Sequence, residues 1–291
     1  MSKLGITTHL IDGKLLSQQI KNRLKEEIND FEKEGRRLPH LSVVLIGESP
    51  ASKIYVSGKE KAANEVGISS STFNLESNVD GKQVVSLIDK LNGDNAVDAI
   101  LVQLPLPKHL NEDYLLSLVS PEKDVDGFHP ANLGCLFSGR ESYSIPCTPA
   151  GIIKLIDATG VPISGKSAVV VGRSNIVGKP VAFLLLKKDM TVTICHSKSE
   201  NLFQVCKTAD VLVSAVGKPR FITSEFVKQG AIVVDVGISR VDNKLVGDVD
   251  FEDVKGIASH ITPVPGGVGP MTIAMLLENT LSLYKKRFLK M

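Results

Sequence analysis

At the centre of the chain stands Ser167-Ala-Val-Val-Val-Gly172-Arg-Ser-Asn-Ile-Val-Gly178-Lys-Pro180. Its apolar run, residues 168–171, has no polar alternation, which is typical of a strand buried on both faces of a parallel sheet. Glycine ends the run, and Pro180 follows Gly178 at a point where the first turn of a helix tolerates proline. Free backbone N–H groups and the helix dipole would then point at one spot and form an anion site. The usual occupant of such a site is the pyrophosphate of a dinucleotide.

Two other interpretations of this turn have to be weighed. The spacing Gly172-x₅-Gly178-Lys179 resembles a Walker A sequence, but that motif has four intervening residues and a Ser or Thr where Pro180 stands. The turn also differs from G-x-G-x-x-G, because Ser174 occupies the position of the second glycine. The glycine pattern alone therefore also fits a purely structural turn.

The next apolar segment, residues 191–195, bears on which nucleotide would bind. In an NAD site an acidic residue about 20 positions beyond the glycines accepts hydrogen bonds from the ribose. This segment ends instead in His196-Ser197-Lys198, without a carboxylate. Ser197, Lys198 and the forked guanidinium of Arg173 suit a 2′-phosphate, so the pattern favours NADP over NAD. A solvated strand end is the alternative interpretation of residues 196–198.

Composition limits the class of protein. The 291 residues suffice for two domains or one large one, and the 43% hydrophobic content is ordinary for a globular protein. A net charge of +2 gives no support to nucleic-acid binding through a basic field. No run approaches the roughly 20 apolar residues of a membrane helix, and residues 1–10 lack a signal-peptide core. The four cysteines lack metal-ligand spacing and are interpreted as buried or incidental thiols. We expect a cytoplasmic protein that binds no metal, nucleic acid or membrane.

Apolar strand-like segments alternate with amphipathic ones along the whole chain, which predicts an α/β fold. Predicted strands cover residues 41–46, 69–75, 97–102, 168–171, 191–195, 211–215 and 232–236. Predicted helices cover residues 15–31, 52–66, 81–91, 111–119, 151–159, a stretch after Gly178, 201–206 and 271–288, whereas residues 121–134 are expected to be irregular. Pro146 and Pro149 mark a boundary between a first domain, 1–148, and a second, 149–270. The closing segment, 271–291, is expected to complete the first domain.

Polar side chains in the first domain suggest a substrate site. Tyr55 and Lys59 lie four residues apart on one predicted helix, so both emerge on the same face. A tyrosine can stack on a flat heterocycle, and a lysine can donate or accept a proton. Gln103, at the end of the third predicted strand, is a neutral amide that can hold a lysine or a ring substituent. Asp124 and Asp126 lie in a loop, where a carboxylate suits the cyclic amidine edge of a pterin. A solvated helix face and a pair of turn-forming aspartates are the structural alternatives.

Five motifs, in order along the chain, carry a resemblance to a known family. They are Gly47-Glu-Ser-Pro-Ala-Ser-Lys-Ile-Tyr55-Val-Ser-Gly-Lys59, Val102-Gln-Leu-Pro-Leu-Pro107, Pro121-Glu-Lys-Asp-Val-Asp126-Gly-Phe-His129, Val171-Gly-Arg-Ser-Asn-Ile-Val-Gly-Lys-Pro180 and Thr262-Pro-Val-Pro-Gly-Gly-Val-Gly-Pro-Met-Thr272. Over nearly its whole length the chain closely resembles the bifunctional methylenetetrahydrofolate dehydrogenase/methenyltetrahydrofolate cyclohydrolase family. It shows no sign of the large formyltetrahydrofolate ligase domain that is fused to some relatives.

The resemblance implies a role for individual residues. Lys59 would be the catalytic residue of the cyclohydrolase step, with Gln103 tuning it. Tyr55 would stack on the folate, and Asp126 would anchor the pterin. Folate contacts are also implied for Val102, Leu104, Pro265, Gly266, Gly267, Val268 and Gly269. Cofactor contacts are implied for Gly172, Arg173, Ser174, Ser197 and Ile238.

The resemblance further implies an activity and an architecture. The expected reaction is NADP-dependent oxidation of 5,10-methylenetetrahydrofolate to 5,10-methenyltetrahydrofolate, followed by hydrolysis to 10-formyltetrahydrofolate. The expected fold has an N-terminal β/α folate and catalytic domain, a C-terminal Rossmann-like parallel-sheet NADP-binding domain, and a cleft between them. Tetrahydrofolate one-carbon derivatives would be the partners, and the protein would form a homodimer.

Two alternative functions stay open at this point. The first is an NAD-specific dehydrogenase of the same family with little cyclohydrolase activity. Arg173 and Ser197 do not decide the cofactor, because some family members with similar residues use NAD with phosphate and magnesium. The second is a nucleotide-sensing or scaffold protein without turnover. The presence of Lys59, Gln103 and Asp126 counts against the first alternative, and that of Tyr55, Lys59 and Asp126 against the second.

Overall fold

The computed structural model describes residues 6–242 and 244–288. The chain forms two compact units. The three-stranded unit consists of Gln18–Cys147 together with the segment from Ile273 onward. The six-stranded unit consists of the residues up to Ser17 together with Thr148–Thr272. The predicted α/β class with two domains is confirmed.

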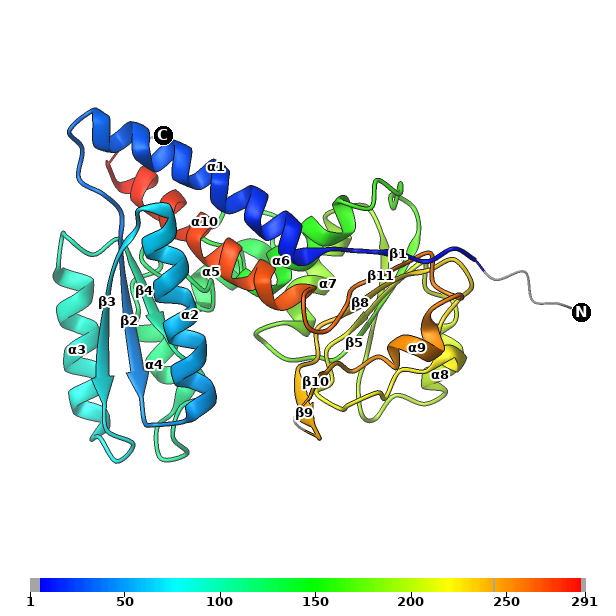
Figure 1. The fold of residues 1–291 in the computed structure, drawn as a ribbon. Coiled ribbons are helices and arrows are strands. Elements are labelled where there is room, and N and C mark those ends of the chain that lie inside the picture. Colours follow the sequence, from blue (N-terminus) through cyan, green and yellow to red (C-terminus); the bar gives the residue numbers. More distant parts are fainter. Residues whose placement is uncertain (1–5, 243, 289–291) are drawn as a thin grey trace, which may run out of the picture. The chain divides into compact units, whose positions relative to one another are not determined.

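The three-stranded unit has a parallel sheet in the order β3-β2-β4. The central strand is apolar and buried, so it needs cover on both faces, and Figure 1 shows α2 and α3 beside the sheet. Helix α3 buries Val84, Ile88 and Leu91, which recur at helical spacing. The elements are β2 (His40–Ile46), α2 (Pro50–Val66), β3 (Ser69–Leu75), α3 (Gly81–Gly93), β4 (Ala99–Val102), α4 (Glu112–Leu118) and α5 (Pro130–Phe137).

Two long helices connect the units along the chain. Helix α1 (Gly13–Lys33) begins in the six-stranded unit and ends in the three-stranded one, and α10 (Val268–Phe288) does the same. Residues from Ile273 onward therefore group with the three-stranded unit, although they are last along the chain.

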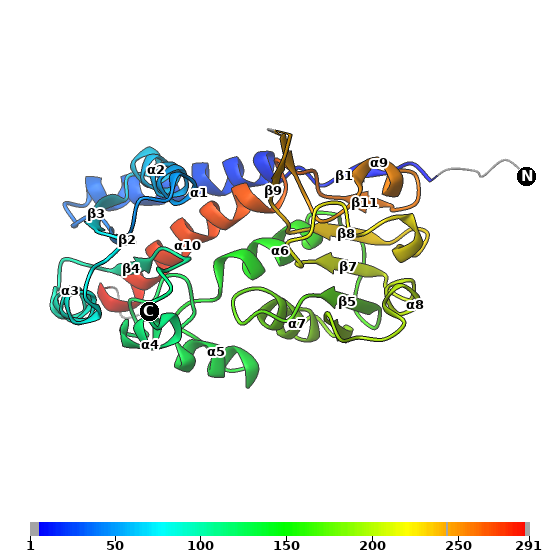
Figure 2. The same ribbon diagram turned by 90° about the horizontal axis from the view of Figure 1, so that it is seen from below.

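The six-stranded unit has a wholly parallel sheet in the order β1-β11-β8-β7-β5-β6. In Figure 2, β5, β7, β8 and β11 follow one another across this sheet. Strands β7 and β8 are buried at every position, as expected for a sheet covered on both faces. The elements are β1 (His9–Leu10), α6 (Cys147–Asp157), β5 (Ser167–Val171), α7 (Gly178–Leu186), β6 (Thr191–Cys195), α8 (Leu202–Cys206), β7 (Val211–Ser214), the 3₁₀ turn η1 (Ser224–Phe226), β8 (Ile232–Asp235), β9 (Ser239–Val241), β10 (Lys244–Val246), α9 (Phe251–Val254) and β11 (His260–Ile261).

The start of the chain was expected to belong to a first domain, 1–148, but it groups with the six-stranded unit instead. Strand β1 pairs with β11, with His9 opposite His260, so this segment belongs to the six-stranded sheet. A two-residue strand is too short to show any periodicity, which is why the sequence did not indicate it. The antiparallel pair β9 and β10, three residues each, was missed for the same reason.

Part of the segment expected to be irregular is helical. Helix α5 begins at Pro130, and the His129 ring accepts a hydrogen bond of 3.0 Å from the Ala131 N–H. Proline at the first helical position and a side-chain cap are both helix-start signals, but the eight residues are too few for a clear apolar period. None of the helices in the described ranges is both long and apolar enough to cross a membrane.

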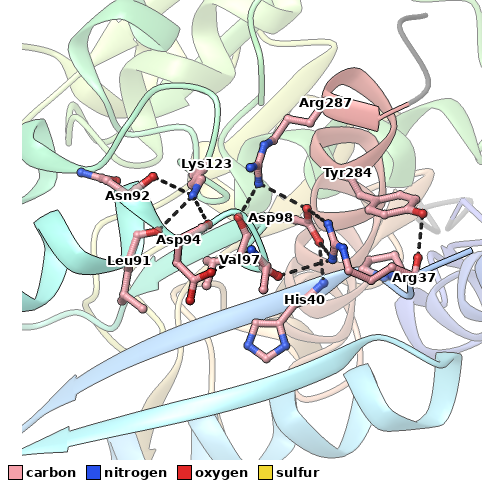
Figure 3. Close-up of polar contacts among 12 residues, drawn as sticks. Arg37, His40, Leu91, Asn92, Asp94, Val97, Asp98, Lys123, Tyr284 and Arg287 are labelled. Atoms are coloured by element: carbon pink, nitrogen blue, oxygen red, sulfur yellow. Dashed lines mark hydrogen bonds and ion pairs between the residues drawn. The ribbon is translucent and has the colours of Figure 1, made fainter.

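A buried carboxylate, Asp98, stabilises the three-stranded unit (Figure 3). Its two oxygens accept two hydrogen bonds of 2.7 Å from the Arg37 guanidinium, and one of them lies 3.3 Å from Arg287 on α10. The backbone N–H of His40, at the start of β2, donates to the same group at 2.8 Å. One aspartate thus links α10, the segment before β2 and the start of β4.

Candidate functional site

The turn after β5 closes so tightly that it requires glycine at two positions. Gly172 has φ +132°, and a Cβ there would lie 2.4 Å from the Ala215 carbonyl oxygen. A Cβ on Gly178 would lie 2.2 Å from the Gly172 carbonyl oxygen. The Ser174 hydroxyl accepts hydrogen bonds from the N–H groups of Val177 and Gly178, at 3.1 and 3.2 Å. The turn therefore brings backbone close to any ligand at the start of α7.

The position of this turn in the sheet is the second indication of a nucleotide site. From β5 the chain first adds β6 on one side and then returns to add β7 on the other, so the strand order reverses between β5 and β7. In open parallel sheets ligands bind outside the carboxyl ends of the strands at such a reversal. Gly172 follows β5 and Ala215 follows β7, so both lie at this point.

Arg173 and Ser197 project from neighbouring strand ends. Val171 pairs with Cys195 in the register of β5 and β6. Arg173 lies two positions beyond Val171, and Ser197 lies two positions beyond Cys195. Both residues are exposed, so a ligand can reach the guanidinium and the hydroxyl. Ser174 is also exposed, at the same turn. These groups fit an anionic ligand such as a 2′-phosphate, by charge and by the fork of the guanidinium.

Ile238 and the predicted folate-contacting glycine loop line one small pocket of about 120 Å³ within the six-stranded unit. Asp235 and Lys14 also line it. Packing here is tight, because a Cβ on Gly13 would lie 1.9 Å from the Gly267 carbonyl oxygen. The predicted residues in this lining are Ile238, Pro265, Gly266, Gly267, Val268 and Gly269.

Lys59 lies in the three-stranded unit, on α2, and its environment differs from that of a solvated lysine. Only 7% of the residue is exposed, whereas Tyr55, one turn earlier, is 44% exposed. The Lys59 Nζ donates a hydrogen bond of 2.9 Å to the Gln103 Oε1. The Gln103 Nε2 in turn donates to the Leu104 carbonyl at 2.7 Å, which fixes the amide oxygen toward the lysine. The arrangement excludes the solvated-face interpretation for Lys59 and leaves it open for Tyr55.

The two aspartates after β4 have different environments. Asp124 accepts hydrogen bonds from the N–H groups of Gly127 and His129 and from the Asn132 amide, at 3.1, 2.8 and 2.8 Å. It is therefore the turn-forming residue that the sequence also allowed. Asp126 is the residue that interacts electrostatically with Lys59. Burial raises the pKa of Asp126, while the Lys59 charge and a hydrogen bond from the Cys147 thiol act in the opposite direction.

Cys147 belongs to this cluster, although the sequence suggested only a buried or incidental thiol. The residue is buried, and burial together with the charge of Asp126 raises its pKa well above the usual value. The thiol therefore stays protonated and can donate a hydrogen bond. Its position directly after Pro146 indicated only a domain boundary, so nothing in the local pattern identified it.

Asn279 on α10 was missed as well. Its Nδ2 donates to the carbonyl oxygens of Val125 and Ile145, both at 2.8 Å. These carbonyls belong to the residues just before Asp126 and just before Pro146, so one amide holds two loops of the site together. Glu278 and Thr280 flank it along the helix, so its polar side chain gave no distinguishing signal in the sequence.

Replacing Asn279 by alanine should destabilise the three-stranded unit. Two carbonyl groups lose their donor, and the expected loss is about 1–3 kcal/mol in the free energy of unfolding. Urea unfolding followed by circular dichroism measures it. Ser282→Ala, three residues along α10, is the matched control and should change the free energy by less than about 0.5 kcal/mol. Equal effects of the two substitutions would contradict the anchoring role.

Within the described ranges, no three His, Cys, Asp or Glu side chains are placed to hold a metal ion together. The groups gathered around Lys59 are instead an ammonium, a carboxylate, an amide and a thiol. Such a set can move protons and orient a polar heterocycle. The turn at Gly172, in the other unit, can hold a dinucleotide phosphate.

Comparisons with known proteins match both parts of the chain to one family. The model of the tetrahydrofolate dehydrogenase/cyclohydrolase catalytic domain matches residues 11–126, and that of the family's NAD(P)-binding domain matches residues 146–288. The curated relative "Bifunctional protein FolD" of Sulfurihydrogenibium sp. (strain YO3AOP1) is 54% identical over 282 residues, which are 97% of this chain and 99% of the relative.

Solved structures give the same result. The bifunctional methylenetetrahydrofolate dehydrogenase/cyclohydrolase from Campylobacter jejuni is similar with a TM-score of 0.94 and 48% identity, covering 97% of this chain and 100% of that one. The Trypanosoma brucei enzyme, solved with NADP cofactor and inhibitor, is similar with a TM-score of 0.92 and 39% identity, covering 96% and 98%. The chain therefore belongs to the tetrahydrofolate dehydrogenase/cyclohydrolase family.

Proposed function

We propose that this protein oxidises 5,10-methylenetetrahydrofolate with NADP and hydrolyses the resulting 5,10-methenyltetrahydrofolate to 10-formyltetrahydrofolate. The observation that carries the proposal is the buried ammonium of Lys59, hydrogen-bonded to Gln103 at 2.9 Å and coupled to Asp126. A chain that had kept only the fold would not need to bury a lysine against an amide, because such burial costs free energy.

The hydrolysis requires water to add to a cationic carbon and a ring C–N bond to open. Protons must leave the water and reach the departing nitrogen, which is the work of a general acid and base. We assign this proton transfer to Lys59, with Gln103 holding its Nζ in place. Asp126 would bind the N–H edge of the pterin, and Tyr55, which is 44% exposed, would stack on the ring.

The oxidation requires a hydride acceptor, which NADP supplies when bound. The residues present fit this cofactor, because the Gly172 turn leaves no room for a side chain and exposes Arg173 and Ser197 beside it. In this step the protein binds and orients, since the folate donates the hydride without a strong base. The pyrophosphate would lie against the Gly172 turn at the start of α7, where the helix dipole favours an anion, and Arg173 would hold the 2′-phosphate.

Further parts of the proposal rest on the family resemblance. They include a homodimer in the cytoplasm, folate contacts by Val102, Leu104 and residues 265–269, and cofactor contacts by Ser174 and Ile238. They also include a division of roles in which the three-stranded unit carries the catalytic lysine and the six-stranded unit binds the cofactor. The product would supply one-carbon units for the synthesis of purines, histidine and methionine.

An absorbance assay with methylenetetrahydrofolate tests the proposed function directly. NADP and NAD are supplied in parallel, and both the reduced cofactor and the methenyl intermediate are followed. We expect NADPH to form and hydrolysis of the methenyl compound to proceed without cofactor. Turnover with NAD alone would favour the NAD-specific alternative, and no turnover with either cofactor would favour a binding protein.

Arg173→Ala should weaken NADP binding far more than NAD binding. A charge-assisted hydrogen bond contributes about 1.5–3 kcal/mol, so the Kd for NADP should rise roughly 10- to 150-fold. The Kd for NAD, which lacks the 2′-phosphate, should change little. Titration calorimetry with both nucleotides measures the two constants.

Arg240→Ala is the control for this experiment, because Arg240 is exposed on β9 in the same unit. It removes the same charge from the unit and should leave both nucleotides bound as before. An equal loss of NADP and NAD affinity in Arg173→Ala would show that Arg173 does not bind the 2′-phosphate.

A further inference from the structure

Two carboxylates are buried side by side in the six-stranded unit. Asp235, the last residue of β8, is 3% exposed, and Asp248 is fully buried. Neither takes part in any of the ion pairs found among residues 6–242 and 244–288. Two buried carboxylates without a cation need many hydrogen bonds to offset their desolvation.

Asp248 obtains these bonds from one loop, residues 214–218. Its Oδ2 accepts from the N–H groups of Val216 and Gly217 at 2.7 and 3.2 Å, and from the Ser214 hydroxyl at 3.3 Å. Its Oδ1 accepts from the Lys218 N–H at 2.9 Å. Three successive backbone N–H groups thus point at a single side chain.

Asp235 holds Asp248 in place. Its Oδ1 accepts from the N–H groups of Gly237 and Asp248 at 3.0 and 2.8 Å, and its Oδ2 accepts from the Val249 N–H at 2.9 Å. A Cβ on Gly247 would lie 1.8 Å from the Asp235 Oδ2, and a Cβ on Gly237 would lie 2.2 Å from the Asp248 Oδ1. The two glycines therefore permit the carboxylates to approach the backbone this closely.

The loop that Asp248 holds borders the proposed nucleotide site. It follows β7, the strand across the reversal from β5, and its Ala215 carbonyl oxygen lies only 2.4 Å from where a Cβ on Gly172 would be. The conformation of this loop therefore decides how much room the Gly172 turn has. Three successive N–H groups are also an anion-binding arrangement. Since Asp248 occupies them, a dinucleotide phosphate cannot use them.

We infer that Asp248 is a positioning residue for NADP, because its carboxylate holds the 214–218 loop as one wall of the cofactor site. The inference rests on the proposed NADP-dependent oxidation. Asp248 does not touch the cofactor in this account and acts through the backbone of residues 216–218. Asp235 fixes the position of Asp248 by accepting a hydrogen bond from its backbone N–H.

Asp248→Asn tests the inference. An asparagine has the same shape, but one of its two terminal groups is an NH₂, which cannot accept from the loop N–H groups that it faces. The loop should shift, and the KM for NADP should rise about tenfold or more. Hydrolysis of methenyltetrahydrofolate, assayed without NADP, should stay within about twofold of the wild type, because Lys59 lies in the other unit.

Asp250→Asn is the matched control. Asp250 is also an aspartate that accepts a backbone hydrogen bond in this unit, from the Asp253 N–H at the start of α9. Its substitution should leave the KM for NADP unchanged. An unchanged KM in Asp248→Asn would overturn the inference, whereas the absence of NADP-dependent turnover in the wild type would overturn the proposed function itself.

Ser214→Ala covers the case in which Asp248→Asn does not fold. The substitution is small, keeps every backbone contact of the loop and removes one hydrogen bond to the Asp248 Oδ2. The KM for NADP should rise about twofold to fivefold, with hydrolysis unaffected. Wild-type NADP kinetics in Ser214→Ala, together with an unfolded Asp248→Asn, would reduce Asp248 to a stability role and overturn the inference.

Discussion

Lys59→Met should lower the rate of methenyltetrahydrofolate hydrolysis by roughly 10²- to 10⁴-fold, the usual contribution of a positioned acid or base. Methionine keeps most of the aliphatic stem and removes the ammonium that donates to Gln103 at 2.9 Å. NADP binding should be unchanged, because the Gly172 turn belongs to the other unit. Stopped-flow absorbance of the methenyl compound measures hydrolysis, and calorimetry measures NADP binding.

Lys61→Met is the control for this substitution, since Lys61 is exposed on the same helix. It should hydrolyse the methenyl compound at the wild-type rate. Hydrolysis that survives in Lys59→Met would transfer the proton-transfer role to another group of the cluster, with Asp126 the first to examine.

Asp98→Ala should destabilise the three-stranded unit by about 3–5 kcal/mol, the usual result of removing one partner of a buried ion pair. The substitution removes the carboxylate that the Arg37 and Arg287 guanidinium groups and the His40 N–H share. Arg37 is partly exposed and can turn to water, so the lower end of this range is expected. Urea unfolding monitored by circular dichroism gives the free energy.

Asp30→Ala provides the comparison, because Asp30 pairs with Lys33 on the open surface of α1. Water and salt screen such a pair, so no measurable change in stability is expected. If both substitutions had the same small effect, Asp98 would not link α10 to the sheet in the way that the contacts indicate.

The alternation of apolar and amphipathic segments was sufficient to predict the α/β fold. In a long segment, the spacing of the apolar residues shows whether it is a helix or a strand and which face is buried. The run at residues 168–171 is the buried strand β5, and the predicted turn follows it. Chain order alone could not show that the strand order reverses between β5 and β7, since that depends on which strands pair. Short elements such as β1 and α5 carry too few residues for a pattern, and tertiary pairing or a cap defines them.

The candidate site was predictable in part. The spacing of Tyr55 and Lys59 indicated a common helix face. Only the structure shows that the Lys59 side chain is buried whereas the Tyr55 ring is exposed. Residue type and spacing could not distinguish Asp124 from Asp126, because both lie in the same loop before Gly127 and only their partners differ. Cys147 and Asn279 come from distant segments, so no local pattern could place them beside Asp126. The catalytic roles themselves stay predictions.

The division of the three-stranded unit between residues 18–147 and the segment from 273 onward has a consequence for biosynthesis. Domains generally fold as units while the chain emerges from the ribosome, N-terminal part first. This unit is begun early but lacks α10, and with it Asn279 and Arg287, until translation has passed the whole six-stranded unit. The six-stranded unit can therefore finish folding first, although most of the three-stranded unit is synthesised before it.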